Sequence, residues 1–118
     1  MIPQEENFAE QIRQAGAAIR DAEKGLAEAE ANEKREMSRQ MVIAQGAGHK
    51  SAAAQSVYAD GTEQMYQARL HRGVKKGALA AAKANLVASE TAVRVWQTKM
   101  SMLKLEARTY GYEPRPAS

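Results

Sequence analysis

Apolar side chains recur at alternating steps of three and four residues over two long stretches of this chain. The clearer stretch runs from Leu79 to Tyr110, and only one of its members, Ser89, is polar. Its positions are Leu79, Ala82, Leu86, Ser89, Val93, Trp96, Met100, Leu103, Ala107 and Tyr110. This spacing places every member along one seam of an α-helix, which needs a second helix to pack against. The pattern predicts a helix over about residues 62–110.

A second stretch with the same spacing predicts another long helix over about residues 5–45. Its positions are Phe8, Ile12, Ala15, Ile19, Ala22, Leu26 and Ala29. The pattern then passes through Glu33 and continues at Met37 and Met41 in four-residue steps, a stutter that locally unwinds a coiled coil. Residues 28–36 contain no large apolar side chain. We expect this part of the helix to be its most weakly anchored, and continuity through it stays an open question.

The segment 46–61 reads as a linker. Gly46 and Gly48 stop the first helix, since glycine tolerates the left-handed dihedrals common after a helix end. Ser51 is a suitable N-cap for a short helix over 51–58.

Two further signals mark the ends of the final helix. Asp60 and Glu63, three residues apart, resemble a capping box and are expected to begin it. Gly111 and two nearby prolines end it, which leaves a disordered tail at 111–118.

Two long helices joined by a short linker pack most simply as an antiparallel helical hairpin. We therefore predict an all-α protein with one domain, residues 1–118. The final helix also carries a second apolar stripe, about a third of a turn from the seam. Its members are Ala81, Ala84, Ala88, Ala92, Val95 and Met102. One partner helix cannot cover both faces, so the stripe predicts a homodimer that forms a helical bundle, or an outside partner.

Composition narrows the class of protein further. Alanine supplies much of the apolar content, and it forms helices well but buries little area. The chain has no cysteine, which excludes disulfides and thiolate metal sites. Its acidic start does not resemble a secretory signal, and no run of about 20 apolar residues exists to span a membrane. We expect a cytoplasmic protein without a membrane contact.

Charge divides the chain into an acidic and a basic part. Residues 1–45 carry nine acidic and six basic side chains, whereas residues 46–118 carry five acidic and eleven basic ones. Packed antiparallel, the two helices attract each other. A cluster of cations on the final helix consists of Arg69, Arg72, Lys75, Lys76 and Lys83. It is either a solvated face near a close helix crossing at Gly73 and Gly77, or a site for phosphate groups or an acidic protein surface.

Candidate catalytic or metal chemistry is sparse. Gly46 to Ser51 departs from a phosphate-binding loop because His49 separates Gly48 from Lys50 and no strand precedes it. The two histidines have no carboxylate or histidine partner at helical spacing, so neither a metal nor a cofactor is expected. The methionines and Trp96 read as packing residues. We expect no enzymatic activity.

Residues 94–111 form the closing run Arg-Val-Trp-Gln-Thr-Lys-Met-Ser-Met-Leu-Lys-Leu-Glu-Ala-Arg-Thr-Tyr-Gly. This run resembles small α-helical accessory proteins of bacteriophage genomes. The resemblance implies an inhibitor that binds a host or defence factor, located in the host cytoplasm. The sequence thus favours a non-enzymatic protein-binding module. Its alternative is an anion-binding protein that recognises nucleic acid or a nucleotide through the cationic cluster.

Overall fold

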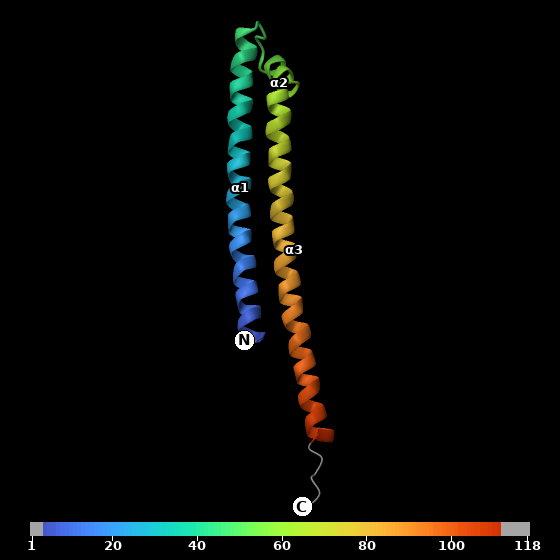
Figure 1. The fold of residues 1–118 in the computed structure, drawn as a ribbon. Helices are drawn as coiled ribbons and strands as arrows, with labels where there is room; N and C mark the ends of the chain where they lie inside the picture. The colour runs from blue at the N-terminus through green and yellow to red at the C-terminus, as the bar shows by residue number, and fades with distance from the viewer. Residues whose placement is uncertain (1–3, 112–118) are drawn as a thin grey trace, which may run out of the picture.

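The chain folds as a long antiparallel hairpin of two helices (Figure 1). A computed structural model describes residues 4–111, with side chains as far as Thr109. Helix α1 spans Gln4–Gly46, α2 spans Ala52–Asp60 and α3 spans Glu63–Glu106, and a π-helical turn, η1, continues α3 over Ala107–Gly111. The molecule measures 99 × 23 × 17 Å. The prediction of an all-α hairpin is confirmed, and the helix bounds agree with it to within a few residues.

The two seams face each other along the hairpin. Ala15 and Ala29 of α1 are almost completely buried, and Leu79, Leu86 and Val93 of α3 are half-buried against α1. The small alanine side chains let the helix backbones approach closely. Near the open end, the rings of Phe8 and Trp96 meet edge to face, with centroids 5.6 Å apart. Phe8 lies four residues from Gln4, where the described part of α1 begins.

The seam of α3 extends further toward its N-terminus than the apolar pattern indicated. Met65, Ala68, Arg72 and Lys75 continue the three- and four-residue steps up to Leu79. Met65 is the largest side chain that is fully buried. The charged residues at two of these positions hid the continuation, because a seam is normally recognised by its apolar members.

The structure answers the question of whether α1 is continuous through its middle. The helix is continuous through residues 28–36 and beyond, and Ala29 is 1% exposed. Further along, the side-chain amide of Gln40 is buried and donates a hydrogen bond of 2.7 Å to Glu36. This hydrogen bond joins two residues of the same helix, so it supports α1 itself and not its contact with α3.

The turn between the long helices follows the predicted glycine and cap signals in part. Gly48 has a φ of +104°, and Ser51 caps α2 by accepting a hydrogen bond of 3.0 Å from the backbone N–H of Ala54. The expected capping box is wrong: Asp60 ends α2, and the hydroxyl of Thr62 accepts from the N–H of Met65 to begin α3. The final part of the predicted tail, residues 112–118, lies outside the described residues, and Gly111 belongs to η1.

Candidate interaction surfaces

Two of the five predicted cationic residues are engaged in ion pairs with the rest of the hairpin. The guanidinium of Arg72 lies 3.1 Å from a carboxylate oxygen of Glu33 on α1. Arg69 lies 3.8 Å from the other oxygen of Glu33 and 2.5 Å from the carboxylate of Asp60. Glu33 occupies a seam position, and its side chain is only 17% exposed. These arginines therefore help to join α1, α2 and α3, and they are more than the solvated cations of one predicted alternative.

Lys75 is also part of the helix–helix contact. It is half-buried, and its side chain crosses Gly25 of α1. A Cβ atom at Gly25 would lie 3.5 Å from the Lys75 Cδ, which is ordinary van der Waals contact. The aliphatic stem of Lys75 therefore packs on α1 at Gly25, and a methyl group at that position would also fit.

Lys76 and Lys83 are exposed, as are Arg69 and Arg72, but they differ from those arginines in their contacts. Among residues 4–109, no ion pair within 4 Å involves either lysine. Gly73 and Gly77, beside them, have open space where a Cβ would stand. The close helix crossing expected at these glycines is therefore not made by α1. The structure does not bring the five cations together as one free surface.

The C-terminal end of α3 runs past the start of α1 (Figure 1). Since Trp96 meets Phe8, the described part of α1 continues for four residues beyond the contact, whereas α3 and η1 continue for fifteen. About eleven residues, or about 16 Å of helix, thus have no α1 backbone beside them. Leu103 of the predicted seam lies in this segment and is 55% exposed, and Met100, which is 36% exposed, lies just before it, beside the first residues of α1. We call the seam side of α3 from Met100 through Leu103 to Ala107 the open end of α3.

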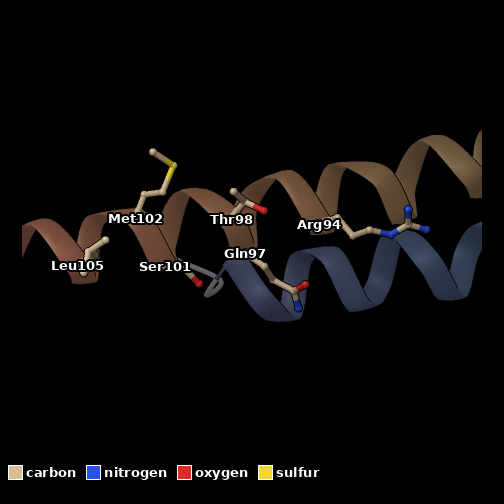
Figure 2. A pocket seen from close by; sticks show the side chains of 6 residues that line it. All are labelled: Arg94, Gln97, Thr98, Ser101, Met102 and Leu105. Atoms are coloured by element: carbon tan, nitrogen blue, oxygen red, sulfur yellow. The ribbon is translucent and has the colours of Figure 1, made fainter.

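Exposed apolar side chains also lie on other sides of this segment. A shallow surface depression on one of these sides is lined by Arg94, Gln97, Thr98, Ser101, Met102 and Leu105. Figure 2 shows the Met102 side chain pointing away from the α1 ribbon and the Gln97 side chain toward it. Leu105 is also exposed, so apolar side chains project from several sides of the same three turns.

A third surface lies along the side of α3 that α1 leaves uncovered. The predicted stripe from Ala81 to Met102 is exposed, and the same face continues back to Tyr66 through exposed Leu70 and Val74. We call this face the outer stripe; its members are Tyr66, Leu70, Val74, Gly77, Ala81, Ala84, Ala88, Ala92, Val95, Lys99 and Met102. The sequence prediction missed its first four members because they precede the alanine-rich segment.

Reactive groups do not converge on any of these surfaces. No group of three histidine, aspartate or glutamate side chains in the described part of the chain is arranged to hold a metal ion. The rings of His49 and Tyr58 pack together with their centroids 5.1 Å apart, and His71 is exposed on α3. Each buried side-chain nitrogen or oxygen in residues 4–109 has a hydrogen-bond partner. Within the same residues, no helix is both long and apolar enough to cross a membrane.

No protein-family model, curated protein or solved structure matches this chain. The functional argument thus rests on the three surfaces of the hairpin. Glu33 and Asp60 are the partners that the sequence prediction did not identify. One signal for Glu33 was present, since it and Arg72 are charged residues at seam positions of two helices that had to pair.

Proposed function

We propose that the chain is a non-enzymatic protein-binding module that docks its partner at the open end of α3. One observation carries the proposal: the seam that binds α1 continues from Met100, beside the first residues of α1, to Leu103 and Ala107, which lie past the described part of α1. A helix placed there would extend α1 and use the same three- and four-residue spacing. Exposed apolar side chains that are grouped in this way mark protein interaction sites more often than isolated ones do.

The charges beside the open end favour an acidic amphipathic helix as the partner. Lys99, Lys104 and Arg108 surround it, and Glu106 is the single acidic residue among them. The hairpin uses the same complementarity internally, because the first turn of α1 is acidic and Glu5 lines a surface depression together with Lys104. A partner helix with the character of α1 would continue this pairing of opposite charges.

The resemblance of the last third of the chain to phage accessory proteins supports a role as an inhibitor of a host or defence factor. An inhibitor of this kind acts by covering a surface on its target, and it needs no catalytic group. The anion-binding alternative has weaker support, because Arg69 and Arg72 are paired with carboxylates and Lys75 crosses the seam.

A binding assay with synthetic helices tests the docking face. The probe is a fluorescent peptide of about four heptads with leucine at the seam positions and glutamate beside them, and a lysine version is its control. We expect the acidic peptide to bind the chain, more weakly as salt rises, and the lysine peptide not to bind. The variant Leu103→Glu should abolish binding, whereas Val87→Glu, the same change at an exposed position outside the seam and the outer stripe, should not.

Equal binding to the two variants would refute the open end as the docking face. Equal binding of the acidic and lysine peptides would refute the acidic chemistry. The same variants then identify the natural partner in a host lysate: it is the protein retained by the wild-type chain and by Val87→Glu but lost with Leu103→Glu.

A further inference from the structure

The hairpin leaves much more surface exposed than a compact protein of its size. Its accessible surface is 8758 Å², against about 6,300 Å² for a typical folded monomer of 12.9 kDa. Its radius of gyration is 27.0 Å, about twice the value for a compact domain of this length. Part of this excess follows from the elongated shape, which allows each long helix to contact only one other. The outer stripe belongs to this excess surface.

The outer stripe is a regular feature of α3 from end to end. From Tyr66 to Met102 it advances in ten steps of three or four residues, an average of 3.6 residues a step. That period matches a straight α-helix, so the stripe stays on one side of α3 over about 54 Å. Small residues, Gly77 and four alanines, occupy its centre, and large apolar residues occupy its two ends.

This arrangement is self-complementary in one orientation. In an antiparallel pair of α3 helices centred between Ala84 and Asn85, Val74 lies opposite Val95 of the second copy. Gly77 then lies opposite Ala92 of the second copy. Ala81 and Ala88 face each other in the same way, and the Tyr66 end meets the Met102 end. Small side chains thus meet at the centre, where helices can approach to about 8 Å, and large ones meet outside it.

The same centre is also the midpoint of α3. Since α3 spans Glu63–Glu106, the two antiparallel helices overlap along their full length with no unpaired end. The stripe alone determines the centre, and the helix bounds are a separate observation that agrees with it. A stripe that binds an unrelated partner helix would not need small and large residues placed symmetrically about a centre. Nor would that centre need to coincide with the midpoint of α3.

The charges of α3 allow this pairing. Lys76, Lys83 and Arg94 project about 100° away from the outer stripe, on the side that would face solvent. Lys99 is the single charged member of the stripe, and it lies opposite Leu70 of the second copy. Its aliphatic stem can cover Leu70 while its ammonium group reaches water.

We infer that the outer stripe binds a second copy of this chain and forms a symmetric antiparallel four-helix bundle. The interface is independent of the open end of α3, which lies on the seam side of the helix. The two surfaces also differ in their response to salt. Because both copies carry like charges beside the stripe, screening strengthens their association, whereas it weakens the docking of an acidic helix.

Sedimentation of the full chain from about 1 to 100 μM tests the inference, since a specific dimer interface has a dissociation constant in or below that range. We expect a dimer, and Ala88→Glu at the centre of the stripe should weaken it by at least about tenfold. Ala88 is exposed in the single hairpin, so circular dichroism should show that the variant keeps its helices. Val87→Glu should leave the dimer intact. A monomer at 100 μM, or equal association of the two variants, would overturn the inference.

Single cysteines test the orientation, since the chain contains none of its own. Under mild oxidation, Ala84→Cys should form a disulfide-linked dimer because the two copies of this position lie beside the symmetry axis. Val74→Cys alone should not, because its two copies are about 32 Å apart along the bundle. A mixture of Val74→Cys and Val95→Cys should form a mixed dimer. Efficient cross-linking of Val74→Cys to itself would show a parallel pairing and refute the antiparallel bundle.

Discussion

Reversal of charge at Arg72 should destabilise the hairpin, while the same reversal one helical turn away at Lys76 should not. Arg72 lies 3.1 Å from Glu33 across the helix–helix contact, whereas Lys76 is exposed and has no such partner among the described residues. Both substitutions, Arg72→Glu and Lys76→Glu, introduce the same side chain into the same helix. A difference between them therefore reports the contact with Glu33 and not helix propensity.

The expected magnitude follows from the exposure of the pair. Side-chain exposure is 46% for Arg72 and 17% for Glu33, so the loss of the pair should cost about 1 kcal/mol, the upper end of the range for exposed ion pairs. Two carboxylates about 4 Å apart add roughly 1 kcal/mol of repulsion in a water-like dielectric. Arg69, which stays 3.8 Å from Glu33, offsets part of this repulsion. We expect Arg72→Glu to lower the free energy of unfolding by about 1–2 kcal/mol and Lys76→Glu to change it by less than about 0.5 kcal/mol.

Urea unfolding followed by circular dichroism at a single protein concentration measures both values, since association would otherwise alter the apparent stability. The background variant Glu33→Gln supplies the control. Without the carboxylate of Glu33, Arg72→Glu should cost no more than Lys76→Glu does. An equal cost of Arg72→Glu in the two backgrounds, or equal costs at Arg72 and Lys76, would refute the assignment of Arg72 to the seam.

Three further predictions concern the turn and the exposed lysines. Gly48→Ala should cost about 1 kcal/mol in urea unfolding because φ is +104° there, whereas Gly46→Ala, at a helical position with open space, should stabilise the chain slightly. Thr62→Ala removes the cap of α3 and should cost about 1 kcal/mol in the same assay, and Thr62→Ser should restore most of that loss. Lys76→Glu combined with Lys83→Glu should leave the affinity for the acidic peptide unchanged within about twofold, and neither this variant nor the wild-type chain should retard DNA or RNA in a mobility assay at physiological salt. A salt-dependent retardation by the wild-type chain that the variant lacks would favour the anion-binding alternative instead.

The hairpin was predictable because its strongest signals are local. Steps of three and four residues determine which side of each helix is apolar. Gly48 marks the turn because glycine tolerates a positive φ, and the structure has that conformation there. The antiparallel arrangement then follows from a connection too short for any other packing of two long helices. These signals depend on neighbouring residues alone, and the sequence states them directly.

The errors arose where a residue's role depends on a distant one. Arg72 looked like a solvated cation until α1 brought Glu33 beside it. Asp60 and Thr62 are both suitable N-caps, and the choice between them depends on the end of α2. Asp60 instead forms an ion pair with Arg69, nine residues along the chain. The sequence shows which residues are charged and which can cap a helix. Which residue each of them contacts depends on how the three helices pack.

The position of the open end of α3 has a consequence for docking if the chain dimerises through the outer stripe. In an antiparallel bundle, the two copies of Leu103 lie near opposite ends of the assembly and remain on the seam sides of their helices. Each dimer therefore presents two equal docking sites far apart, and both cannot reach one short partner helix at the same time. A target with two suitably spaced helices, or an oligomeric target, would be bound with an avidity that neither site has alone. Ala88→Glu should then weaken binding to such a target while leaving the affinity for the single acidic peptide unchanged. Leu103→Glu should abolish both, because it removes the contact on which the avidity depends.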